Sequence, residues 1–138
     1  MMKSKIHRAT ITDTNLDYVG SITLDPELMA RADIREFEQV AVLDIDNGSR
    51  FETYAMLGGP GDVIVNGAAA HLVGPGHKVI VITYGSYDEE ELADYAPLVV
   101  HVDETNREIP EADAVQRVGS NLVWMQPARA GRRSRPGS

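Results

Sequence analysis

The sequence predicts a mainly β fold, a small barrel with short helices, and three observations lead to this expectation. Short segments with alternating or β-branched apolar residues recur along most of the 138 residues. Breaks rich in glycine and proline separate these segments, and the segments with a helical pattern span only a few residues. Many short strands at close spacing, with little helix between them, are typical of small β-barrels.

The first strand is expected at residues 5–12. Alternation places Lys5, His7, Ala9 and Ile11 on one face of this strand. Taken alone, the pattern favours a solvated face for Lys5 and His7. A turn is expected at residues 13–17, and an extended segment at residues 18–24.

A short helix is expected to begin after Asp25, because Asp25-Pro26-Glu27 combines a capping carboxylate, a proline at the first helical position and an acid in the first turn. The dipeptide Asn47-Gly48 is typical of a β-hairpin turn. Helical turns are expected at residues 68–70 and 88–94. The remaining strands are expected at residues 39–46, 50–57, 62–65, 78–84 and 98–102, and the apolar strand at 78–84 is expected to be central.

The composition indicates one domain with an aliphatic core. Hydrophobic residues make up 43% of the chain and aromatic residues only 6%. We expect a single barrel domain over residues 1–118 and a disordered basic tail over residues 119–138, where the pattern decays. No stretch approaches the ~20 apolar residues that span a bilayer, and the N-terminus lacks an apolar signal region. A cytoplasmic protein that does not enter membranes is therefore expected.

Charge and residue types exclude several kinds of site. The chain has no cysteine, so disulfides, thiolate metal sites and a cysteine nucleophile are excluded. The net charge is −8, which does not favour binding to nucleic acid. It also repels anionic substrates, so a site for one must concentrate positive charge locally. His71, His77 and His101 show no metal-ligand spacing, and no metal is predicted.

The most informative feature is the Gly20-Ser21 step within YVGS at residues 18–21. Glycine leaves its carbonyl unshielded and tolerates strained backbone angles, and the hydroxyl of the next serine can attack that carbonyl. A Gly-Ser pair by itself is most often a turn. Three further stretches accompany it here: KIHRAT at 5–10, NGSRFETYA at 47–55 and VNGAAAH at 65–71.

These four motifs, in this order and spacing, resemble the pyruvoyl-dependent aspartate 1-decarboxylases, which make β-alanine and CO2 from L-aspartate for pantothenate and coenzyme A synthesis. The resemblance runs from about Lys5 to about Tyr84. It implies a six-stranded double-psi barrel and a homotetramer with sites between subunits. It also implies self-cleavage between Gly20 and Ser21 into residues 1–20 and 21–138. Ser21 then becomes a pyruvoyl group that binds the substrate as a Schiff base.

The resemblance also assigns roles to individual residues. Thr53 matches a threonine needed for self-processing, whose hydroxyl could stabilise the developing oxyanion. Tyr54 matches the tyrosine that returns a proton to the α-carbon. The substrate-binding residues it implies are Lys5, His7, Arg50, Asn66, Gly67, Ala68 and Ala69. The guanidinium of Arg50 can bind a carboxylate through two parallel hydrogen bonds, and the backbone N–H groups of residues 67–69 could bind an oxyanion.

Adjacent residues of a strand point to opposite faces, so Thr53 and Tyr54 can serve one site only under special conditions. Either the strand bulges between them or the site lies between subunits, and the family's tetramer favours the second arrangement. Two other functions stay open at this point: a non-catalytic β-barrel binding module, and a pyruvoyl enzyme acting on another amino acid. Cleavage could also depend on a maturation factor.

Overall fold

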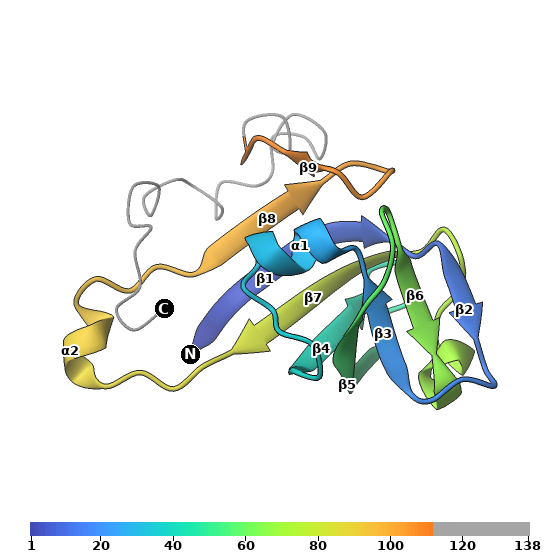
Figure 1. The fold of residues 1–138 in the computed structure, drawn as a ribbon, viewed down its shortest axis with the longest axis horizontal. Coiled ribbons are helices and arrows are strands. Elements are labelled where there is room, and N and C mark those ends of the chain that lie inside the picture. Colours follow the sequence, from blue (N-terminus) through green and yellow to red (C-terminus); the bar gives the residue numbers. More distant parts are fainter. Residues whose placement is uncertain (112–138) are drawn as a thin grey trace.

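Figure 1 shows a computed structural model of the chain, which describes residues 1–111. The fold is mainly β with short helices, as predicted. The predicted basic tail and the last residues of the predicted domain lie outside the described residues. The strands are β1 (Met2–Thr10), β2 (Asp13–Asn15), β3 (Ser21–Leu24), β4 (Gln39–Asp44), β5 (Arg50–Leu57), β6 (Val63–Asn66), β7 (Lys78–Tyr84), β8 (Leu98–Val102) and β9 (Glu108–Ile109). The helical segments are α1 (Pro26–Arg31), the 3-10 helix η1 (Gly67–His71) and α2 (Glu89–Leu92).

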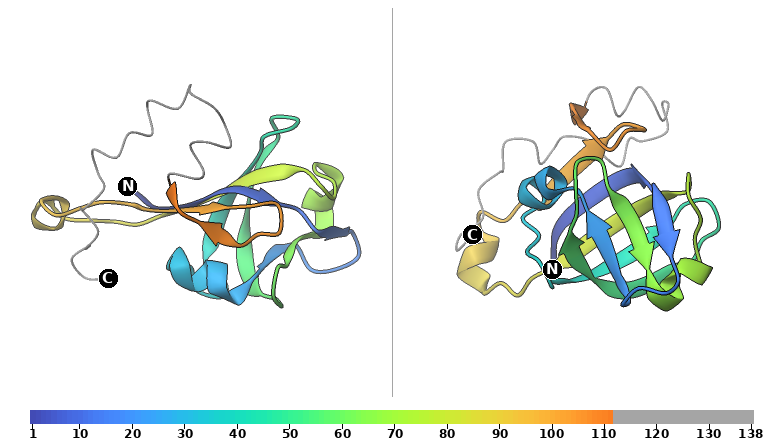
Figure 2. Two further views of the ribbon diagram at one scale, coloured as in Figure 1. Left: turned by 90° about the horizontal axis from the view of Figure 1, so that it is seen from above. Right: turned by 45° about the vertical axis from the view of Figure 1, so that its right-hand side comes forward.

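The described strands form one hydrogen-bonded ladder in the order β2-β6-β3-β5-β4-β7-β1-β8-β9. The six consecutive strands from β6 to β1 wrap around a common interior, as Figure 2 shows. The ladder itself is not closed. The chain itself connects β1 with β6, which lie at opposite ends of this group of six strands. β2 follows β1 after two residues and pairs with β6 in parallel.

Backbone hydrogen bonds hold this crossing in place. Ile11 N donates to His77 O at 2.9 Å, and Thr12 N donates to Val63 O at 2.8 Å. The turn predicted at residues 13–17 is therefore only partly right, since its first three residues form β2. A three-residue strand with polar ends carries too little alternation to be recognised as a strand from its sequence.

Alternate residues of the strands point inward and form the aliphatic core. Its fully buried members include Ile6, Ile22, Leu24, Val42, Val65, Val79 and Val81. The central position predicted for β7 is confirmed, because β7 pairs with β1 on one side and with β4 on the other.

A β-bulge in β1 changes the face assignment made from alternation. The register against β7 shifts between His7 and Ala9, and Arg8 adopts a positive φ of 69°. Ile6 and Ala9 are consequently both in the core, three residues apart. The prediction that His7 shares a face with Ala9 is wrong, because a bulge adds one residue to the strand and reverses the alternation beyond it. The solvated face expected for His7 is wrong too, since His7 is buried.

The predicted helix start and hairpin are confirmed. The Asp25 carboxylate accepts a hydrogen bond from Glu27 N at 2.7 Å and caps α1. β4 and β5 pair as an antiparallel hairpin, and Gly48 in its turn has a φ of 79°. Within residues 1–111, no helix has the length and apolar character needed to cross a membrane.

Candidate functional site

Ser21 is the first residue of β3, which lies between β5 and β6 in the sheet. β3 runs antiparallel to β6, with Ser21 opposite Asn66, and parallel to β5, with Ile22 opposite Ala55. Extending the β5 register back by one residue places Ser21 beside Tyr54. Two of the matching motifs therefore flank the third in space, although they are far apart in the sequence.

The Ser21 hydroxyl is buried and held in one orientation. Only 1% of Ser21 is exposed to solvent. Asn66 Nδ2 donates a hydrogen bond to Ser21 Oγ at 3.0 Å, and Ser21 Oγ donates to Val19 O at 3.0 Å. Asn66 Nδ2 also donates to Thr23 Oγ1 at 3.0 Å. Asn66 thus fixes the serine oxygen directly next to the Gly20 peptide.

The backbone of Gly20 packs against Gly67. A Cβ added to Gly67 would lie 2.6 Å from Gly20 Cα and 2.8 Å from Gly20 N, and Gly67 has a φ of 78°. Gly20 itself does not have a positive φ, and a Cβ added there would contact nothing within 4 Å. The backbone at Gly20 itself therefore does not exclude a side chain. The close packing requires glycine at position 67.

Residues 67–69 thus have different surroundings. Gly67 is buried against Gly20, Ala68 is exposed, and Ala69 is half-buried and packs on the core. All three belong to η1, which begins directly after Asn66.

Thr53 and Tyr54 do point to opposite faces of β5. The strand keeps a regular register against β4, with Thr53 opposite Val40 and Tyr54 opposite Gln39. Val40 belongs to the core, so Thr53 faces inward and Tyr54 faces outward with Ser21. The bulge considered from the sequence is absent here. The Tyr54 ring lies 6.3 Å from the ring of Phe37, which is 66% exposed.

Arg50 shares the outer face of β5 with Tyr54 but is distant from it. It is exposed at the start of the strand, and four residues of extended chain correspond to about 13 Å. The structure therefore brings Ser21, Tyr54, Asn66 and Gly67 together, and places Arg50 at the edge of this group.

Lys5 and His7 lie elsewhere on the barrel. They belong to β1, which is four steps from β3 in the ladder order. At about 4.8 Å for each step, this is about 19 Å along the sheet. Along the ladder, Lys5 and His7 therefore lie on a different part of the barrel wall from Ser21.

Burial lowers the pKa values of the residues around His7. It lowers the pKa of Lys5 from its ordinary value. Burial, with smaller contributions from the charges of Lys5, His101 and Arg8, lowers the pKa of His7 to about 4. Burial also lowers the pKa of His101. Both histidines are therefore neutral near pH 7, and Lys5 supplies positive charge beside them.

Sequence reasoning missed two arrangements of histidine. The spacing of His101 in the sequence indicates no role for it, but it lies opposite His7 in the parallel β1–β8 register. His77 forms a cluster with Asp44 and Asp46, whose ligand atoms lie within 4.8 Å of one another. The His77 Nδ1 and Asp44 Oδ2 atoms are 2.6 Å apart, which is a direct hydrogen bond. These pairs depend on strand register, which residue spacing does not reveal.

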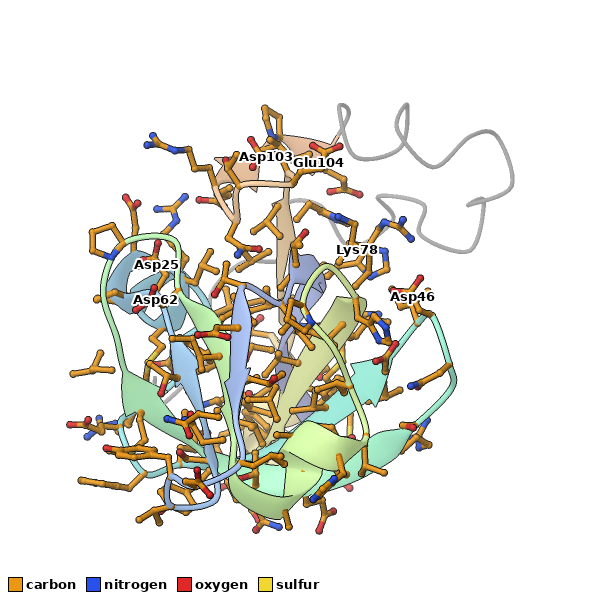
Figure 3. All side chains as sticks on the ribbon, turned by 90° about the vertical axis from the view of Figure 1, so that its right-hand side faces the viewer. Asp25, Asp46, Asp62, Lys78, Asp103 and Glu104 are labelled. Atoms are coloured by element: carbon orange, nitrogen blue, oxygen red, sulfur yellow. The ribbon has the colours of Figure 1, made fainter. Side chains whose placement is uncertain are left out.

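The other acidic side chains near the barrel ends bind backbone N–H groups. Asp46 Oδ2 accepts from Lys78 N, and Asp25 Oδ2 accepts from Gly61 N. Asp62 Oδ2 accepts from Gly59 N. Figure 3 shows Asp25 and Asp62 next to each other at one end of the barrel, and Asp46 near Lys78. These carboxylates thus stabilise turns.

Comparisons with known proteins identify the family of this chain. A family model described as aspartate decarboxylase matches residues 1–109. The chain belongs to this family. The aspartate 1-decarboxylase of Acetivibrio thermocellus is 58% identical over 109 residues, which cover 78% of this chain and 86% of the relative. That of Heliobacterium modesticaldum is 54% identical over 114 residues, with 81% and 86% covered. That of Clostridium kluyveri is 56% identical over 108 residues, with 77% and 85% covered.

Proposed function

We propose that the protein is a self-processing, pyruvoyl-dependent decarboxylase that converts L-aspartate to β-alanine and CO2 for pantothenate and coenzyme A synthesis. The observation that carries this proposal is the buried Ser21 hydroxyl, which Asn66 holds next to the Gly20 peptide. Membership of the aspartate decarboxylase family supports the same activity.

Self-processing begins when Ser21 Oγ attacks the Gly20 carbonyl carbon, and the acyl group moves from the nitrogen of Ser21 to its oxygen. Loss of the Cα proton of Ser21 expels the Gly20 carboxylate and leaves a dehydroalanine. Water adds, ammonia departs, and residue 21 becomes a pyruvoyl group. The Thr53 hydroxyl is assigned to the developing oxyanion, as the family resemblance implies. Extending the β3–β5 register back by two residues from Ile22 and Ala55 is consistent with this role, because it puts Thr53 level with Gly20.

The surroundings of Ser21 fit a pyruvoyl group. The position is buried, and Asn66 donates a hydrogen bond to the oxygen there. The group supplies a carbonyl electrophile and an electron sink for loss of the α-carboxylate. Tyr54, on the same outer face, holds the proton that returns to the substrate α-carbon. Arg50 and Lys5 bind the substrate carboxylates, and His7 donates a neutral N–H group.

We propose that a second copy of the chain completes the site. Lys5 and His7 are about 19 Å along the sheet from Ser21. Tyr18, Val19 and Phe37 expose large apolar side chains near the cleavage site and Tyr54, and Val19 is 66% exposed. We assign this surface to contact with another subunit, whose Lys5 and His7 complete the site. The assembly is expected to be a closed tetramer.

Intact mass of the purified protein tests the self-processing. We expect two fragments, residues 1–20 and 21–138, and a larger fragment that resists Edman degradation because it lacks an amine. Ser21→Ala should remain a single chain. Thr23→Val is the matched control, because it removes the other acceptor of Asn66 and leaves the Ser21 hydroxyl in place. A wild-type chain that stays intact after prolonged warming, with and without cell extract to supply a maturation factor, would overturn the proposal.

Co-expression of two inactive variants tests the shared site. Lys5→Met removes the cation and Tyr54→Phe removes the proton donor, so each homo-oligomer should turn over poorly. A mixed oligomer contains some sites with both residues intact if the two groups come from different chains, and activity should reappear. Absence of complementation would place both groups in one chain. Release of CO2 from L-aspartate, compared with L-glutamate, distinguishes the proposed substrate from another amino acid, and no release at all would indicate a binding module.

A further inference from the structure

We propose that His101 is a positioning residue that fixes the ring of His7 for substrate binding. This inference rests on the proposed function of His7. Four observations carry it: the strand register, the burial of both rings, their mutual geometry, and two nitrogen atoms that have no hydrogen-bond partner.

The register places the two histidines side by side. β1 and β8 run parallel, with His7 directly opposite His101 and Ile6 directly opposite Val100. Ile6 and Val100 belong to the core. His7 and His101 therefore point to the other face of the sheet, the same face that carries Lys5.

Both imidazoles are nevertheless buried, with 9% of His7 and 5% of His101 exposed. Their ring centroids are 5.5 Å apart, and the ring planes meet at 77°, an edge-to-face arrangement. Aromatic rings favour this geometry because the positive edge of one meets the negative face of the other. The contact restricts rotation of both side chains.

The unpartnered nitrogen atoms indicate which tautomer each ring adopts. Nδ1 of His7 and Nδ1 of His101 are buried and have no hydrogen-bond partner in the described part of the chain. A buried N–H group without an acceptor is strongly unfavourable and rare in native proteins. Each ring therefore carries its proton on Nε2 and leaves a bare lone pair at Nδ1. The pKa of His7, lowered to about 4 by burial, agrees with a neutral ring.

Lys5, His7 and His101 therefore have different roles at the substrate site. Lys5 provides the positive charge, and His7 provides one N–H donor of fixed direction from Nε2. His101 contacts only His7 in this scheme. It maintains the ring angle and thereby keeps His7 Nδ1 at a buried position without an acceptor. Its removal should therefore loosen substrate binding more than it slows the chemical step.

Two variants of similar size separate ring packing from simple space filling. His101→Phe keeps an aromatic ring against His7, and His101→Leu fills the volume without a ring. Selective ¹⁵N-histidine labelling reports the tautomer of His7 by NMR, and it does not depend on catalysis. The same spectra show whether each variant is folded. A second set recorded on the uncleaved Ser21→Ala chain makes the test independent of processing.

We expect His7 to be the Nε2–H tautomer in the wild type and in His101→Phe, and a mixture of tautomers in His101→Leu. Freeing one ordered side chain costs about 0.5–1.5 kcal/mol, so KM for L-aspartate should rise about two- to tenfold in His101→Leu with kcat nearly unchanged. His101→Phe should restore both values. Failure of all variants and the wild type to release CO2 would refute the proposed function but leave the NMR test intact. A pure tautomer in His101→Leu, or an equal defect in His101→Phe, would overturn the role of His101.

Discussion

Replacing Gly67 with alanine should slow self-cleavage about 100-fold while leaving the barrel folded. The added Cβ would lie 2.6 Å from Gly20 Cα, whereas ordinary contact begins at 3.4 Å. The backbones at Gly20 and Gly67 must therefore separate by about 0.8 Å, which displaces the Gly20 peptide relative to Ser21 Oγ. Misplacement of reacting atoms by about 1 Å can slow a reaction about 100-fold, and we expect a loss of that size in the rate of cleavage.

Gly76→Ala is the matched control for this variant. Gly76 has a φ of 88°, comparable to the 78° of Gly67, but a Cβ added there contacts nothing within 4 Å. Both variants should lose about 1–2 kcal/mol of stability from the left-handed backbone alone. Only Gly67→Ala should combine that loss with slow cleavage.

The assay follows the disappearance of the intact chain by mass spectrometry, starting from protein purified in the cold. Chemical denaturation of the uncleaved Ser21→Ala chain, with and without each glycine substitution, measures the stability change separately. Two results would refute the reasoning: cleavage of Gly67→Ala at the wild-type rate, or an equal delay in Gly76→Ala.

Three further predictions concern turnover and stability. Tyr54→Phe should cleave normally but lose roughly 100-fold or more in kcat, because only the proton donor is removed; slow cleavage would contradict this. Arg50→Lys should raise KM for L-aspartate about tenfold, since a point charge replaces a two-pronged contact, and an unchanged KM would remove Arg50 from the site. The hydrogen bond to Asp44 raises the pKa of His77, so its protonated form stabilises the fold below about pH 6.5, and this contribution is lost as pH rises through the folded pKa. The difference in Tm between wild type and His77→Asn should therefore shrink from about pH 6 to pH 9, and a constant difference would contradict it.

Much of the fold follows from local sequence. Asp25-Pro26 predicts a helix cap, Asn47-Gly48 predicts a hairpin turn, and KVIVITY predicts a central strand. In each case the residues that determine the structure lie within a few positions of one another. The bulge at Arg8 and the strand β2 are not visible this way. Both depend on pairing with β7 or β6, which are remote in the sequence, and pairing partners override a short local pattern.

Some features of the candidate site could likewise be predicted from the sequence, and others could not. The resemblance to the family predicts roles for Ser21, Asn66 and Tyr54, and the structure places these residues on one face of neighbouring strands. The packing of Gly67 on Gly20 and the contact between His7 and His101 required coordinates. Each brings together residues more than forty positions apart, through a register that no single segment encodes.

The crossing of β1 into β2 gives the cleavage an effect on how the protein can refold. Both strands lie within residues 1–20, the segment that the cut would release, yet they pair with β6, β7 and β8 of the larger fragment. After the proposed processing, the barrel would be an association of two separate polypeptides. Its refolding is then a bimolecular reaction that weakens on dilution, whereas the uncut chain folds at a rate independent of concentration. The proposed cleavage would thus make recovery of the folded barrel depend on protein concentration.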